Sequence, residues 1–66
     1  MDPRTRRAAS TAQSKALSAG LGHMSHATVK TVPGGLLVSL RRSPKGKVAC
    51  RVLVSTEGGI CTARIQ

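Results

Sequence analysis

Apolar residues are distributed unevenly along the chain, and most of the Val, Leu and Ile falls in residues 27–66. Segments that contain Gly and Pro divide this region into four apolar-rich runs, at residues 27–32, 36–42, 47–55 and 60–65. Short glycine-containing gaps between such runs are typical of consecutive hairpins. The pattern therefore predicts a mainly β fold, a small three- to four-stranded antiparallel meander.

The turns between the runs determine the register, because a slip of one residue would move every side chain to the other face of the sheet. We expect a three-residue loop over 44–46 and a two-residue turn at Glu57 and Gly58. One apolar face then results from the pairs Val38–Val52, Leu40–Cys50, Leu36–Val54, Val54–Cys61, Val52–Ala63 and Cys50–Ile65. A turn at Pro33 and Gly34 would extend this face, although a Pro-Gly pair favours type II geometry, which splays hairpin strands. The pairs that it adds are Val29–Val38 and Ala27–Leu40.

Residues 1–26 have a different composition, dominated by Ala, Ser, Thr and Arg. Asp2 is a suitable helix N-cap, Pro3 falls on the favoured first helical position, and Gly20 is a suitable stop. Alanines recur at helical spacing at Ala8, Ala12, Ala16 and Ala19. However, Ser and Thr lower helix propensity, and arginines near the positive end of the helix dipole are unfavourable. We therefore expect a basic arm that is disordered or partly helical.

The charge of the chain limits the functions that this fold would serve. Eleven Lys and Arg against two Asp and Glu give a formal net charge of +9 on 66 residues, and aromatic residues are absent. A chain this short, without aromatic rings, builds only a small core, so we expect neither an enzyme nor a cofactor. The excess of positive charge favours a polyanionic partner, either nucleic acid or an acidic protein surface.

The registers above also gather positive charge on the second face of the sheet. The residues expected there are Lys30, Leu37, Ser39, Arg41, Ala49, Arg51, Leu53, Thr62 and Arg64. Arg51 would stand directly opposite Arg64, which is destabilising unless an anion lies between them, and guanidinium groups match phosphate geometry. The predicted nucleic-acid- or anion-binding residues are Arg4, Arg6, Arg7, Arg41, Arg42, Lys45, Lys47, Arg51 and Arg64. The alternative is that these side chains only lay their aliphatic stems on the sheet and point their charges into water.

These features lead to two functional hypotheses of different classes. In the first, a small basic protein contacts the phosphate backbone of nucleic acid with little sequence specificity, since stacking aromatic residues are missing. In the second, a structural or regulatory interaction module (a virion or complex subunit, or a small inhibitor) acts by sheet augmentation or oligomerisation. An alanine-faced helix covers little apolar surface, which favours a homodimer or a larger assembly. A chain without a selected function is the third alternative.

Other candidate sites are weaker. His23 and His26 lack a third ligand nearby, so we expect no metal site. Cys50 and Cys61 would be two buried thiols about 13 Å apart, too far for a disulfide. Two cysteines make no disulfide framework, so the expected location is an intracellular, reducing compartment, with organellar import or a virion as open alternatives. We expect no transmembrane segment, because no apolar run is long enough.

Overall fold

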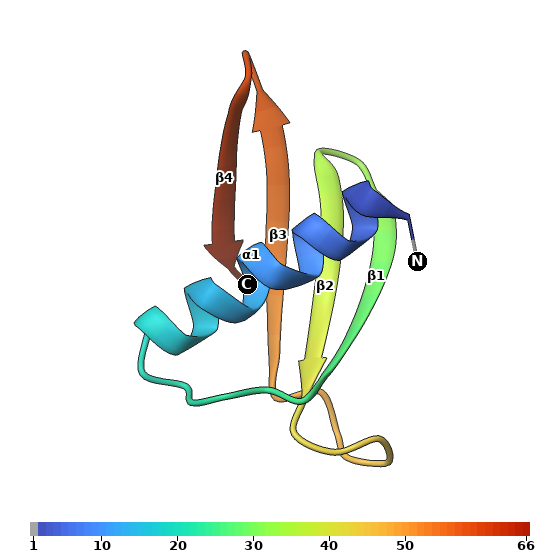
Figure 1. Ribbon diagram of the computed structural model, residues 1–66, viewed down its shortest axis with the longest axis vertical. Helices are drawn as coiled ribbons and strands as arrows, with labels where there is room; N and C mark the ends of the chain where they lie inside the picture. The colour runs from blue at the N-terminus through green and yellow to red at the C-terminus, as the bar shows by residue number, and fades with distance from the viewer. Residues whose placement is uncertain (1) are drawn as a thin grey trace.

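Four antiparallel strands follow one another in the sheet in the same order as in the chain. The computed structural model describes residues 2–66, with a helix, α1, lying across one face of this sheet (Figure 1). The elements are α1 (Pro3–Ser18), β1 (His26–Val32), β2 (Gly35–Arg41), β3 (Cys50–Glu57) and β4 (Ile60–Ile65). The prediction of a mainly β fold, a small antiparallel meander, is confirmed, and of the two states expected for the basic N-terminal arm, disordered or partly helical, the structure shows a continuous helix over Pro3–Ser18.

The register of the first three strands is also as predicted. Val38 on β2 lies opposite Val29 on β1 and opposite Val52 on β3. The Pro33–Gly34 turn is compatible with this pairing because Gly34 takes a φ of +93°, close to the value that a type II turn needs at that position. The chain then passes so close to β3 that a side chain at Gly35 would collide with the carbonyl oxygen of Val54.

The predicted register between β3 and β4 is wrong by two residues. The turn is made by Gly58 and Gly59, so that Glu57 lies opposite Ile60. A two-residue turn of this kind needs positive φ at both central positions, and the glycines supply +58° and +81°, which Glu57 would adopt only under strain. The observed pairs that replace the expected ones include Val52–Ile65, Val54–Ala63, Thr56–Cys61 and Leu53–Arg64. A slip of two residues keeps every side chain on its predicted face.

The connection between β2 and β3 is longer than predicted, because β3 begins at Cys50 instead of residue 47. Ser43 to Gly46 forms a separate turn, in which the Gly46 N–H donates to the Ser43 carbonyl at 3.2 Å. The Ala49 N–H then donates to the Leu40 carbonyl at 2.8 Å and closes the pairing of the two strands. The loop therefore changes where the strands end and leaves the predicted register between them intact.

Local signals at both ends explain where α1 begins and ends. The Asp2 side chain accepts a hydrogen bond from the Thr5 N–H at 2.8 Å, and Pro3 occupies the first helical position. At the other end Gly20, with a φ of +81°, follows the cap residue. The Leu21 N–H donates to the Ala16 carbonyl at 3.0 Å, which is the long bond of a Schellman motif. The predicted cap and stop are thus confirmed.

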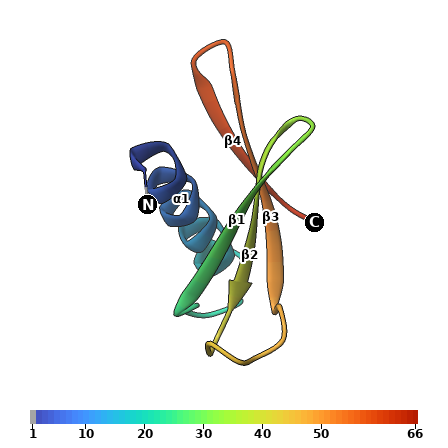
Figure 2. The same ribbon diagram turned by 90° about the vertical axis from the view of Figure 1, so that its right-hand side faces the viewer.

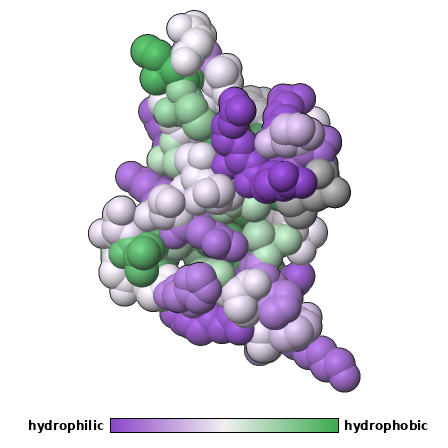
Figure 3. Space-filling view, in the orientation of Figure 1, coloured by the Kyte–Doolittle hydropathy of each residue, from purple (hydrophilic) through white to green (hydrophobic). Residues whose placement is uncertain are grey.

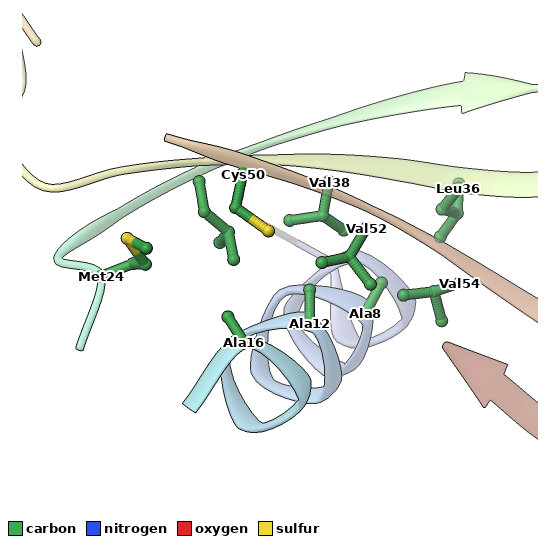
Figure 4. Close-up of a cluster of buried hydrophobic side chains, with 10 residues drawn as sticks. Ala8, Ala12, Ala16, Met24, Leu36, Val38, Cys50, Val52 and Val54 are labelled. Atoms are coloured by element: carbon green, nitrogen blue, oxygen red, sulfur yellow. The ribbon is translucent and has the colours of Figure 1, made fainter. Parts of the chain in front are cut away.

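The core lies between α1 and the sheet (Figure 4). Ala8, Ala12 and Ala16 point from the helix toward the buried side chains of β2 and β3, of which Val38 and Val52 are fully buried. Because alanine is small, the helix axis can approach the strands closely. The helix therefore covers the apolar face, contrary to the expectation from the sequence, and this face no longer calls for a homodimer to cover it.

Candidate functional site

Within residues 2–66, the sheet face that points away from α1 has no second layer on it (Figure 2). Since side chains alternate along a strand, the residues between the buried Val38, Leu40 and Val52 project to this side. We call it the open face; its residues include Lys30, Leu37, Ser39, Arg41, Arg51, Leu53, Thr62 and Arg64. The predicted assignment of these residues to one face is therefore confirmed.

Three arginines form a diagonal line across the open face. Arg51 lies opposite Ser39, two residues from Arg41, and Arg64 lies opposite Leu53, two residues from Arg51. Diagonal neighbours of this kind have Cα atoms about 7–8 Å apart. Arg41, Arg51 and Arg64, which we call the arginine stripe, thus cross β2, β3 and β4 in two similar steps. The direct Arg51–Arg64 opposition that the sequence analysis expected does not occur, and the repulsion between them is correspondingly smaller.

The stripe is exposed to solvent and lies away from acidic side chains. Arg51 and Arg64 are exposed, whereas Arg41 is half-buried and donates a hydrogen bond from Nη1 to Thr28 Oγ1 at 3.3 Å. The chain has only two acidic residues. Asp2 caps the helix on the other side of the sheet. Glu57 is about 13 Å along β3 from Leu53, the residue that lies opposite Arg64. The positive charge of the stripe is therefore not offset by a nearby carboxylate side chain.

An apolar pair lies beside the stripe. Leu37 and Leu53 face each other across β2 and β3, and both are half-buried. Lys30 is paired with Leu37 on one side, and Arg64 with Leu53 on the other. A cation thus flanks each end of a short apolar row. Lys30 was absent from the predicted binding residues, although the Pro33–Gly34 turn already placed it on this face.

The helix arginines lie on the opposite side of the molecule from the stripe. Arg4 and Arg7 line a groove of about 900 Å³ between α1 and the β3–β4 hairpin, whose wall includes Cys61. Figure 3 views this side and shows hydrophilic side chains over the N-terminal half of α1. Arg6 is exposed on the same helix. The structure therefore does not bring these three arginines together with those of the sheet.

The remaining predicted residues lie in the loop of residues 42–49. Arg42 donates from Nη2 to the Leu21 carbonyl at 2.8 Å, while its own carbonyl accepts from Ser25 Oγ at 2.7 Å. These bonds tie the loop to the segment that follows α1, which gives Arg42 a positioning role. Lys45 and Lys47 are exposed, in the loop that follows the Arg41 end of the stripe.

The two cysteines and the histidines add no reactive cluster to the described residues. Cys50 is buried as predicted, but Cys61 is exposed, because the shifted register places it opposite Thr56 on the outer strand. Within residues 2–66, no three His, Cys, Asp or Glu side chains lie close enough to hold a metal ion. The described helix is too short and too polar to cross a membrane.

Comparisons of the chain with protein-family models, with curated proteins and with solved structures found no significant match to any of them.

Proposed function

We propose that the protein binds nucleic acid through its phosphate backbone, using the open face of the sheet. The arginine stripe is the observation that carries this proposal. Three guanidinium groups lie at similar spacing on an uncovered surface, and no nearby acidic side chain neutralises their charge. Such a surface suits a linear chain of phosphates better than a single small anion. Lys30 on β1 widens the contact, and the exposed Lys45 and Lys47 extend it beyond the end of β2.

Little sequence specificity is expected from this surface. Aromatic residues are absent from the chain, so bases cannot stack on Phe, Tyr or Trp as they do on single-strand readers. The Leu37–Leu53 pair offers apolar contact to sugars and bases of any sequence. Affinity then comes mainly from phosphate neutralisation, which depends steeply on salt.

The test is a fluorescence anisotropy titration with mixed-sequence DNA and RNA oligonucleotides at several salt concentrations. Four phosphate contacts would weaken binding to duplex roughly a hundredfold between about 50 and 200 mM salt. For Arg51→Ala combined with Arg64→Ala, the same change in salt would cost only roughly tenfold. Arg4→Ala combined with Arg7→Ala removes the same charge from the other side of the molecule and serves as the matched control.

Two results would contradict the proposal. One is the absence of binding at micromolar protein in low salt. The other is an equal loss of affinity in the two double variants, which would show that net charge alone determines binding.

We propose as a second candidate that the protein acts as an interaction module to which another chain adds a strand. It is supported by β4, an edge strand beside which the described part of the chain places no outer neighbour, and whose Ile60 is 67% exposed. The probes are extended synthetic peptides rich in Val and Thr. Binding should protect the outward amides of β4 from hydrogen exchange at high salt; if none of the peptides does so, this candidate fails.

A further inference from the structure

The free edge of β4 has a defined pattern of unpaired backbone groups. The Gln66 N–H donates to the Arg51 carbonyl at 2.8 Å, so these opposed residues form a hydrogen-bonded pair. In an antiparallel ladder such pairs alternate with pairs that are not hydrogen-bonded. Residues 60, 62 and 64 therefore bond to β3 as well. The N–H and C=O groups of Cys61, Ala63 and Ile65 consequently point away from the sheet.

This pattern is complementary to itself. We propose that β4 pairs antiparallel with β4 of a second copy of this chain, about a two-fold axis that is perpendicular to the sheet and passes midway between Ala63 of one copy and Ala63 of the other. Ala63 then lies opposite Ala63 of the second copy, and Cys61 lies opposite Ile65. This register uses all three outward residues of both strands, with about six backbone hydrogen bonds at two per pair. A shift by two residues in either direction would leave outward groups unpaired.

The exposed apolar residues support this choice of partner. The large hydrophobic side chains with the greatest exposure are Leu17, Ile60 and Ile65, at 60%, 67% and 39%. Two of them belong to β4, and the third is in the last turn of α1, which extends past β4 in Figure 1. A strand added to β4 would lie beneath this end of the helix, and pairing would cover Ile65 with the exposed Cys61 of the second copy.

The proposed symmetry also fixes the relation between the two open faces. Directly opposed residues of an antiparallel pair lie on the same side of a sheet, so both helices lie on one side and both arginine stripes on the other. The inference rests on the second candidate function, that β4 accepts a further strand. Dimer formation does not depend on nucleic-acid binding, and added salt should affect the two in opposite directions. Two chains of charge +9 repel each other, so added salt should strengthen the dimer.

The first experiment is sedimentation equilibrium of the full chain without nucleic acid, over a range of protein and salt concentrations. We expect a monomer–dimer equilibrium that shifts toward the dimer as salt is raised. Ala63→Pro removes one outward N–H from each copy while leaving the bonds to β3, and proline is tolerated on an edge strand. It should raise the dimer dissociation constant roughly tenfold or more. Lys47→Ala, in the exposed loop, is the control and should not weaken the dimer.

A cysteine scan tests the register even if the proline variant fails to fold. In a Cys61→Ser background, Ala63→Cys places two thiols on residues whose Cα atoms are about 5.5 Å apart, within disulfide range. Ile65→Cys places them about 13 Å apart along the paired strands, as does the native Cys61. Disulfide-linked dimers should therefore form fastest with Ala63→Cys.

A chain that stays monomeric at every concentration, or a crosslink that forms faster at residue 65 or 61, would overturn the inference. Since no nucleic acid is present, that result would leave the phosphate-binding proposal untouched. The peptide experiment would still decide whether another chain adds to β4.

Discussion

The two faces of the sheet are built from alternate residues of the same strands but differ in almost every physical property. On one face Val38, Leu40 and Val52 are fully buried beneath the alanines of α1. On the other face Arg51 and Arg64 are exposed without a covering layer. The contrast indicates that the helix-covered face holds the fold together, whereas the charges of the open face are free to serve binding.

The largest effect is expected from truncating a leucine on the covered face. Leu40→Ala should lower the free energy of unfolding by about 2–5 kcal/mol, because it leaves a cavity in the core between helix and sheet. Folded proteins have only about 0.05–0.15 kcal/mol of stability per residue, roughly 3–10 kcal/mol for this chain, so the variant should lose a large share of its stability.

Leu37→Ala on the same strand is the matched control for the open face. Leu37 is half-buried, so its truncation should cost much less than that of Leu40. Urea unfolding followed by circular dichroism measures both. Equal losses in the two variants would break the distinction between the faces.

A smaller loss is expected from enlarging the helix where it touches the sheet. Ala12 has no exposed surface, so Ala12→Leu should force the helix and the strands apart at a cost of about 1–3 kcal/mol. Ser14→Leu, at an exposed position of the same helix, should change stability by less than about 0.5 kcal/mol. If the two thermal midpoints fall equally, the alanines are not what seats α1 on the sheet.

The cap of α1 should give a still smaller, pH-dependent effect. The Thr5 N–H, which donates to the carboxylate, holds the pKa of Asp2 below its ordinary value of 3.8. The stabilisation by this carboxylate is therefore complete above pH 3.8 and is lost as the pH falls through the lower pKa of the folded state.

Urea midpoints at neutral and strongly acidic pH should show this loss. Asp2→Ala should destabilise the protein at neutral pH, and its difference from the wild type should shrink in acid. Asp2→Asn keeps an oxygen acceptor and cannot titrate, so it serves as the control. A difference between wild type and Asp2→Ala that does not change with pH would show that the carboxylate is not the capping group.

The smallest effect on stability is expected on the open face. Arg51 is exposed and lies far from acidic side chains, so Arg51→Ala should change the free energy of unfolding by less than about 0.5 kcal/mol. A clear loss of stability, measured by urea unfolding, would mean that the arginine stem is part of the fold's own packing.

Side-chain parity is the part of the fold that could be predicted from the sequence. Glycine-containing turns divide the strands, and the Pro33–Gly34 turn and the 44–46 loop give a correct register from β1 to β3. The β3–β4 register was wrong because turns at 57–58 and at 58–59 keep the same parity. Two features distinguish the two turns. One is the need for positive φ at both turn positions, and the other is the repulsion that a direct Arg51–Arg64 pair would bring.

The docking of the helix could not be predicted in the same way. Its alanine spacing and its cap and stop were visible, but low propensity argued against a stable helix, and packing on the sheet overrides propensity. As a result, the sequence alone does not separate Arg4 and Arg7 from the sheet arginines, although they lie on the other side. The sequence places Arg41, Arg51 and Arg64 on the correct face because the face depends on parity alone, whereas the position of Arg64 relative to Arg51 depends on the β3–β4 register.

The most direct test of the account is a nuclear magnetic resonance titration that follows the arginine side-chain N–H signals while a mixed-sequence oligonucleotide is added. The account predicts that the signals of Arg41, Arg51 and Arg64 shift together, while those of Arg4 and Arg7 stay nearly in place. Shifts confined to the helix arginines, or spread equally over all of them, would contradict it.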